Sequence, residues 1–211
     1  MGNVMLLFNR MLRVSGGPAA MAWAHEVTAG VNKHATSPAS LWAGSFGAPA
    51  GTIAWSSLLE DLGAMSDLNA AVASDAALTA KVSEAKNYVV EAEADRLMAI
   101  VHGEITEPAP VGGYIGAVQA VAAPGKWAAA GAWAAHIADV YASVTGLDVV
   151  VASTTAGPMG EMTWLVRHDD ASSIESAIAA TMTSEKYMSE VEGGGEFFMP
   201  GANQMYAQRV A

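Results

Sequence analysis

Gly47-Ala-Pro-Ala-Gly-Thr-Ile-Ala-Trp55 recurs later in the chain as Ala156-Gly-Pro-Met-Gly-Glu-Met-Thr-Trp164. At a shift of 109 residues, the proline, the second glycine and the tryptophan coincide. From the composition, the chance that a proline, a glycine and a tryptophan all coincide at one given shift is roughly one in ten thousand. Trp23 and Trp133 match in the same order at a nearly equal shift. The sequence therefore predicts a tandem duplication.

Each copy is predicted to fold as strand, helix, strand, strand, helix, strand. The Gly- and Pro-containing repeat is typical of a hairpin turn between two strands, and the Ala-rich stretches show helical spacing of apolar residues. In the first copy we expect strands over Val4–Leu12, Leu41–Phe46, Thr52–Leu59 and Arg96–His102, with helices from Gly16-Gly17-Pro18 onward and from Ser66 to Asn87. In the second we expect strands over Tyr114–Val121, Asp148–Thr154, Glu161–Arg167 and Gln204–Val210, with helices over Trp127–Val144 and Ser173–Glu190.

These element orders predict an α+β protein made of two ferredoxin-like β-α-β-β-α-β repeats. We expect the first repeat over residues 1–103, a Pro- and Gly-rich linker over 104–112 and the second repeat over 113–211. In such a unit both helices cover one face of the sheet, so the other face needs a partner. The two repeats are therefore expected to pack sheet to sheet as an α/β barrel within one chain.

This duplicated pattern resembles the dimeric α/β-barrel superfamily, in which two ferredoxin-like units pack through their sheets. Antibiotic-biosynthesis monooxygenases, EthD and NIPSNAP-type proteins belong to it, and chlorite dismutases contain two such units per chain. The resemblance covers nearly the whole chain and rests on element order and duplication, without a short motif that singles out one family. It implies the fold more strongly than any activity, since members include cofactor-independent oxygenases, haem enzymes and isomerases.

Composition narrows the classes of function. The chain has 211 residues, a net charge of −11 and no cysteine. The missing cysteines exclude disulfides, thiolate metal sites and cysteine nucleophiles, and no spacing of histidines predicts a metal site. The acidic charge argues against nucleic-acid binding. The sequence shows no secretory signal and no sufficiently long apolar run, so we expect a cytoplasmic protein without a membrane partner, as a monomer or a homo-oligomer.

Polar residues inside predicted strands and paired tryptophans suggest a pocket between sheet and helices. In cofactor-independent oxygenases of the resembled superfamily, Asn, Trp and Arg side chains hold an activated phenolic substrate in such a place. The alternative is that Asn9 and Gln119 bond to each other across the sheets while the tryptophans fill the core. The candidate pocket residues are Asn9, Arg10, Trp23, Trp55, Gln119, Trp133 and Trp164.

His136 is the candidate ligand if the protein binds haem, because a haem-dependent relative would need a helix-borne histidine in the second half. It borders the apolar stripe of its helix, where a hydrogen-bonded structural histidine would also fit. Arg167 could then act as a distal cation, or it is a solvated charge beside Asp169. His102 and His168 are expected at the rims of the sheets.

The sequence thus favours binding of a small apolar or aromatic molecule, with cofactor-independent oxygenation as one possible activity. One alternative is a structural or assembly protein with a filled core, and a second is a haem-binding protein. A cavity above roughly 300 Å³ beside the four paired tryptophans distinguishes the first hypothesis from the structural alternative.

Overall fold

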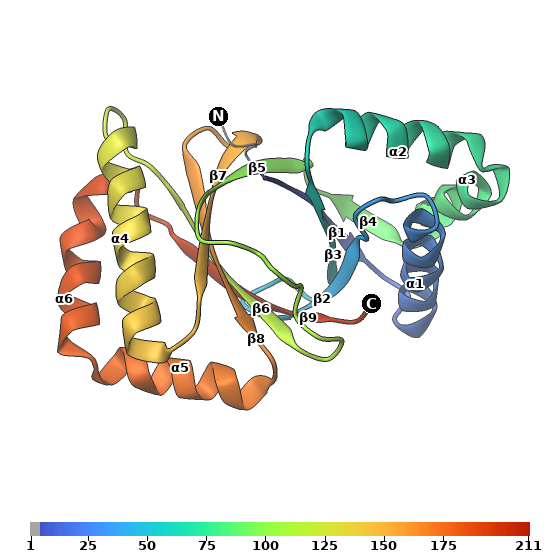
Figure 1. Ribbon diagram of the computed structural model, residues 1–211. Helices are drawn as coiled ribbons and strands as arrows, with labels where there is room; N and C mark the ends of the chain where they lie inside the picture. The colour runs from blue at the N-terminus through green and yellow to red at the C-terminus, as the bar shows by residue number, and fades with distance from the viewer. Residues whose placement is uncertain (1–4) are drawn as a thin grey trace.

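The strands form a closed eight-stranded barrel in a computed structural model that describes residues 5–211 (Figure 1). The order around the barrel is β3-β2-β9-β6-β8-β7-β5-β1, and β1 pairs with β3 to close it. The short strand β4 (Val89–Ala92) is added beside β1. The eight barrel strands are β1 (Leu6–Val14), β2 (Ser40–Phe46), β3 (Thr52–Leu59), β5 (Arg96–His102), β6 (Tyr114–Val121), β7 (Val149–Ala156), β8 (Glu161–His168) and β9 (Asn203–Arg209).

Each half of the chain supplies four neighbouring strands, and the two groups meet at two antiparallel seams. One seam joins β2 to β9, with Trp42 opposite Arg209, and the other joins β5 to β7, with Met98 opposite Thr154. The two sheets are thus hydrogen-bonded at both edges as well as packed through their inner faces. The predicted α+β barrel of two ferredoxin-like units is confirmed.

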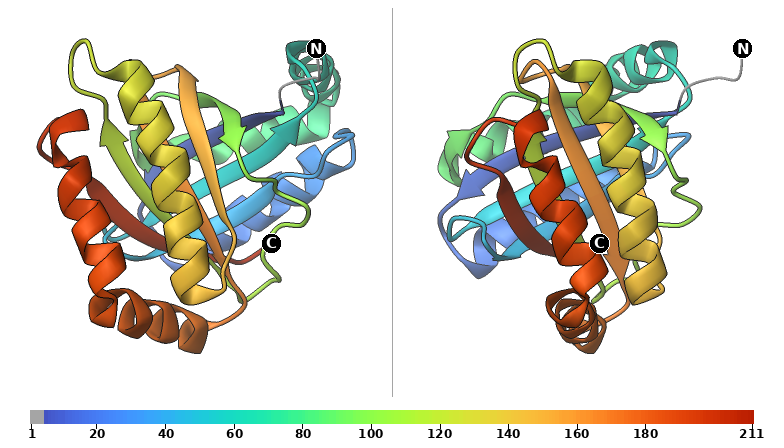
Figure 2. Two further views of the ribbon diagram at one scale, coloured as in Figure 1. Left: turned by 60° about the vertical axis from the view of Figure 1, so that its left-hand side comes forward. Right: turned by 90° about the vertical axis from the view of Figure 1, so that its left-hand side faces the viewer.

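The helices cover the outside of the barrel in two separate layers (Figures 1 and 2). In the right-hand view of Figure 2, α4 and α6 lie side by side in front of the second-half strands. The first layer comprises α1 (Pro18–Asn32), α2 (Leu62–Ser74), α3 (Ala76–Ser83) and the short η1 (Glu84–Asn87). The second comprises α4 (Trp127–Thr145), α5 (Ala171–Thr183), α6 (Glu185–Gly194) and η2 (Gly195–Phe197).

Equivalent contacts in the two halves support the duplication. Trp23 on α1 donates from Nε1 to the carbonyl of Lys81 at 2.9 Å, and Trp133 on α4 donates to that of Glu190 at 3.3 Å. Each helix tryptophan meets a strand tryptophan nearly edge-on: the ring centroids of Trp23 and Trp55 are 6.0 Å apart, and those of Trp133 and Trp164 are 6.1 Å apart. The matched tryptophans of the sequence therefore link helix to sheet in the same way twice.

The second helix of each half differs from the prediction, because it is broken in two. Asp75 and Ser184 have extended backbones, and their side chains accept hydrogen bonds from the amides of Leu78 and Tyr187. Such side chains cap the start of a new helix. The preceding helices α2 and α5 begin earlier than expected because Asp61 and Asp170 cap them. Strand β4 was not predicted, and Val4 of the first predicted strand lies outside the described residues.

The segment after β5 crosses one end of the barrel before β6 begins (Figure 1). Its Ile105 packs against a buried cluster inside the barrel that contains Leu7 and Met98. Across residues 5–211, no helix has the length and apolar character needed to cross a membrane.

Gly51 provides a test of the hairpin geometry that both repeats share. Its φ is +82°, and an added Cβ would lie 2.3 Å from the carbonyl oxygen of Val14. Gly112 also has a positive φ of +92°, but no atom lies within 4 Å of its added Cβ. We expect Gly112→Ala to lower the unfolding free energy by about 1 kcal/mol and Gly51→Ala by about 2–4 kcal/mol in urea titrations. Equal losses would contradict the close approach of the Val14 carbonyl.

Candidate functional site

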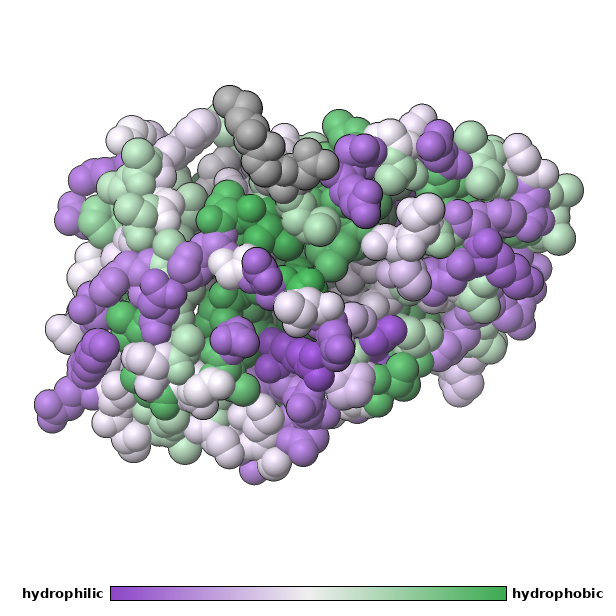
Figure 3. Space-filling model, viewed as in Figure 1, coloured by the Kyte–Doolittle hydropathy of each residue, from purple (hydrophilic) through white to green (hydrophobic). Residues whose placement is uncertain are grey.

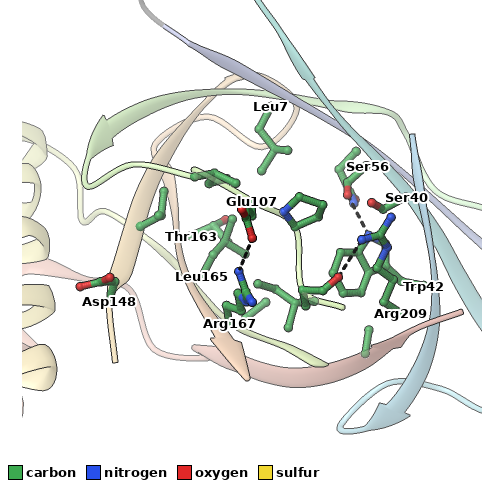
Figure 4. A pocket seen from close by; sticks show the side chains of 18 of the residues that line it. Leu7, Ser40, Trp42, Ser56, Glu107, Asp148, Thr163, Leu165, Arg167 and Arg209 are labelled. Carbon is green, nitrogen blue, oxygen red and sulfur yellow. Dashed lines mark hydrogen bonds and ion pairs between the residues drawn. The ribbon is translucent and has the colours of Figure 1, made fainter. Parts of the chain in front are cut away.

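The barrel wall separates two cavities that lie on opposite faces of the same strands. Side chains of a strand alternate between its faces, so Trp164 and Val166 of β8 face the helices while Thr163 and Leu165 face the barrel interior. The helix-side cavity, between the second-half sheet and α4–α6, has a volume of about 690 Å³. The lumen cavity, inside the barrel, has a volume of about 950 Å³ (Figure 4).

Aromatic rings form much of the wall of the helix-side cavity. Phe198 packs against Trp133 and Trp164, with ring centroids 5.4 and 5.5 Å apart. The volume exceeds the roughly 300 Å³ of a typical small-molecule site, so a pocket does exist where two of the predicted tryptophans meet. In the first half, Tyr88 packs on Trp23 at 5.6 Å within the core cluster.

His168, at the end of β8, is the buried titratable group of this cavity. Its side chain is 1 % exposed, and Nδ1 lies 3.1 Å from Oγ of Ser173. Burial lowers the pKa of His168 below its ordinary value, so the ring is neutral at pH 7. In the tautomer that carries its proton on Nδ1, the ring donates to Oγ of Ser173 and Nε2 is a hydrogen-bond acceptor. Within residues 5–211, Nε2 has no hydrogen-bond partner.

Gly116 on the adjacent strand β6 lets the ring of Tyr206 pack close to His168. A Cβ at Gly116 would lie 3.4 Å from Nε2 of His168 and 3.0 Å from the ring of Tyr206. All three residues line the helix-side cavity. Gly116 therefore allows the Tyr206 ring and Nε2 of His168 to lie close together in the wall of the cavity.

Three tyrosines add hydroxyl groups to an otherwise apolar wall. Burial raises the pKa of Tyr141 to about 12 and also raises those of Tyr187 and Tyr206, so all three stay protonated near neutral pH. The hydroxyl of Tyr206 accepts a hydrogen bond from Nε2 of Gln204 at 3.0 Å and keeps its own proton for another acceptor. The cavity thus combines one neutral base with hydrogen-bond donors.

Exposed apolar side chains surround the opening of the helix-side cavity. Met182 on α5 is 74 % exposed, and the other members of this rim come from α5, α6 and the segment before β9. Such a rim suits the entry of an apolar ligand, because single exposed methionines adapt to irregular shapes. The rim residues are Ile178, Met182, Met188, Val191 and Met199.

The structure divides the residues that the sequence analysis grouped together. Trp133 and Trp164 line the helix-side cavity, whereas Asn9 and Gln119 line the lumen cavity, and no hydrogen bond joins these two amides. Trp23 and Trp55 meet in the first-half core. Asn9 lines the barrel interior, and its amide contacts the Trp55 carbonyl at 3.4 Å, whereas the Trp23 and Trp55 rings lie in the core on the other side of the sheet.

Arg10 and the charged candidates for haem binding lie away from the helix-side cavity. Arg10 is exposed and forms a 2.6 Å ion pair with Asp95. His136 is half exposed, lines neither cavity, and places Nε2 3.0 Å from a carboxylate oxygen of Glu190. Arg167 belongs to the mouth of the lumen cavity, where it pairs with Asp169. His136 and Arg167 therefore do not fit the roles of axial ligand and distal cation at one haem.

Several cavity residues were missed from the sequence. His168 was expected at a sheet rim, and Tyr141, Tyr187, Tyr206 and Gly116 were not singled out. Period-two alternation from Trp164 places His168 on the same face of β8, so a signal for its burial was present. Among residues 5–211, no three histidine or carboxylate side chains are grouped so that they could hold a metal ion.

Comparison with known proteins identifies the fold but no sequence family. No family profile matches the chain, and no curated protein sequence matches it. A candidate monooxygenase from Fusobacterium nucleatum aligns over 100% of this chain and 94% of its own, at 9% identity and a TM-score of 0.74. An anthrone oxidase-like protein aligns over 99% and 92%, at 13% identity and a TM-score of 0.69.

A chlorite dismutase from Candidatus Nitrospira defluvii aligns over 99% of this chain and 92% of its own, at 8% identity and a TM-score of 0.55. At these identities the likeness shows the fold alone. The chain therefore has the dimeric α/β-barrel fold shared by these structures, with both units in one polypeptide.

The lowered pKa of His168 makes stability depend on pH. Between the folded-state pKa and the ordinary value of 6.5, the unfolded chain binds the proton that the folded chain excludes. We expect the His168 contribution to be complete above pH 6.5 and to be lost as the pH falls toward the folded-state pKa. His168→Gln should flatten the fall in unfolding free energy between pH 7 and 5.5, whereas replacement of the exposed His25 by Gln should not. An unchanged slope in His168→Gln would contradict a neutral, buried ring.

Proposed function

We propose that the protein binds a small aromatic molecule with a weakly acidic C–H or O–H group in the helix-side cavity and promotes its oxygenation by O₂. The unbonded Nε2 of His168, a neutral residue in the wall of the helix-side cavity, is the observation on which this proposal rests. The cavity volume and the apolar rim fit a fused-ring substrate.

In this mechanism His168 acts as the general base. Its Nε2 accepts a proton from the substrate while Nδ1–H remains hydrogen-bonded to Ser173, which orients the ring. The resulting delocalised carbanion or phenolate gives one electron to O₂, and the two radicals combine to a peroxide. Loss of water from the peroxide at a methylene carbon leaves a ketone, so CH₂ plus O₂ becomes C=O plus H₂O. No other oxidant is needed.

Tyrosine hydroxyls supply the polar contacts that this reaction requires. The proton of Tyr206 is free to hydrogen-bond to the negative oxygen that develops on the substrate. Trp133, Trp164 and Phe198 pack against a planar ring system and exclude water, which strengthens that hydrogen bond. The structural likeness to an anthrone oxidase-like protein suggests anthrone as the first compound to test.

The structural or assembly alternative predicts a filled core and internally paired polar groups. Two cavities of about 690 and 950 Å³ favour the binding proposal over that alternative. A haem-binding function receives no support from His136, whose ring nitrogen pairs with Glu190 outside both cavities.

Oxygen uptake with anthrone tests the proposed reaction. We expect protein-dependent O₂ consumption, with anthraquinone as product, after subtraction of spontaneous oxidation. His168→Gln should lower kcat by about 10²- to 10⁴-fold, since it removes the base. His136→Gln, outside the cavity, is the matched control and should keep the wild-type rate. Equal rates in the His168 variant and the wild type would contradict the assignment of the base.

Gly116→Ala tests the placement of Tyr206 beside Nε2. The methyl group would stand 3.4 Å from Nε2 and 3.0 Å from the Tyr206 ring, so the ring and the hydroxyl that contacts the substrate must shift. We expect kcat/KM to fall at least tenfold while the unfolding free energy changes by less than about 1.5 kcal/mol, because the Tyr206 ring can move a few tenths of an ångström. A fully active Gly116→Ala protein would place the reacting atom elsewhere.

A further inference from the structure

We infer that the lumen cavity is a second ligand site, separate from the helix-side cavity, for an uncharged molecule with an apolar body and one hydroxyl or carbonyl group. An eight-stranded barrel is just wide enough for side chains to fill it or for one small ligand to occupy it. Here the volume of about 950 Å³ remains open because small residues occupy inward positions (Figure 4). Those small residues include Ser40, Ala54, Ser56, Ala117, Thr163 and Ala207.

The middle of the lumen is apolar. Leu7 and Met98 are buried there, and Leu58, Ile105 and Leu165 pack against them. These side chains come from four strands and from the segment that crosses the barrel end, so they surround the space. They would contact a saturated chain or a ring through dispersion and the hydrophobic effect.

Uncharged polar groups lie deeper in the same cavity. Thr163 is 2 % exposed, and its hydroxyl has no hydrogen-bond partner within residues 5–211. Gln119 stands opposite Thr163 in the β6–β8 pairing, and its amide forms no hydrogen bond with any residue from 5 to 211. Asn9 makes a single long contact of 3.4 Å to the Trp55 carbonyl. Because unpaired buried polar groups are costly, a ligand hydroxyl or carbonyl would stabilise this set.

The arginines at both ends of the lumen already have oxygen partners within the protein. Glu161 lies beyond Thr163 on β8 and is 6 % exposed. Its carboxylate accepts a hydrogen bond from the Thr154 hydroxyl, and one carboxylate oxygen lies 3.2 Å from Nε of Arg96. At the opposite end, Arg209 donates to the Ala109 carbonyl at 2.7 Å, which holds the crossing segment in place.

Arg167 pairs with Asp169 and lies 3.7 Å from Glu107 of the same segment (Figure 4). The arginines of the lumen therefore already have oxygen partners within the protein, and this favours an uncharged ligand over an anion.

The crossing segment also shows where such a ligand enters. Figure 3, viewed from the side of this segment, shows hydrophobic side chains gathered between the two helical layers with hydrophilic ones beside them. A ligand that enters here passes Ile105 and the contacts of Arg209 with Ala109 and of Arg167 with Glu107.

The NMR signals of methionine methyl groups can show which of the two cavities a ligand occupies. Met11 and Met98 line the lumen cavity, whereas Met182, Met188 and Met199 line the helix-side cavity. We expect titration of ¹³C-methyl-methionine-labelled protein with 1-octanol to shift the NMR signals of Met11 and Met98 saturably. Shifts confined to Met182, Met188 and Met199, or no saturable shift, would overturn the proposal.

Gln119→Leu and a matched control test the polar contact of the ligand. Gln119→Leu should weaken 1-octanol binding by about three- to tenfold, as expected for one lost hydrogen bond. Gln208→Leu is the matched control: Gln208 faces away from the lumen and hydrogen-bonds to the Gly112 carbonyl, so its loss should leave the affinity unchanged.

Ala117→Phe, which fills the lumen, should abolish the Met11 and Met98 shifts. Tighter binding of octanoate than of 1-octanol would overturn the uncharged ligand class, and unchanged octanol binding in both Gln119→Leu and Ala117→Phe would overturn the site. A protein inactive toward anthrone would still give these shifts, so the two proposals fail separately.

Discussion

The two antiparallel seams, β2–β9 and β5–β7, are the constraint on which the rest of the structure depends. An open four-stranded sheet would leave backbone donors and acceptors unpaired at its edges, and each half of this chain satisfies them with an edge of the other half. Closure fixes which face of every strand is inside. It therefore creates a lumen and an outer helix-covered surface at the same time, and both cavities exist because the barrel is closed.

The duplicated halves share a frame but differ in what the frame encloses. The Trp23–Trp55 and Trp133–Trp164 pairs have nearly the same separation, and both helix tryptophans donate to a carbonyl of the second helical segment. In the first half, Tyr88 packs directly on this frame. In the second half, tyrosines stand around an open space with His168 at its wall. One half thus has a packed core where the other encloses a cavity.

Sequence periodicity predicts the architecture well and the site poorly, for physical reasons. The repeated Pro-Gly-Trp pattern marks hairpins whose turn glycines, Gly51 and Gly160, both have positive φ. Alternation alone says that Asn9 and Gln119 face opposite to their apolar neighbours, but not whether that face is a lumen or a helix layer. The sequence-based assignment chose the helix layer, whereas the structure places both amides in the lumen. His168 was misplaced because a strand end is exposed unless the next helix folds over it, as α5 does here.

Anomalous diffraction from a bromine-labelled aromatic ligand tests the central claim most directly: that the helix-side cavity of the second half is the reactive compartment. Crystals grown with a bromo-2-naphthol should show the bromine signal beneath α4 and α6, with the phenol oxygen within hydrogen-bond distance of Nε2 of His168. A bromine signal inside the barrel, in the first half or on the outer surface, with the helix-side cavity free of ligand, would contradict the account.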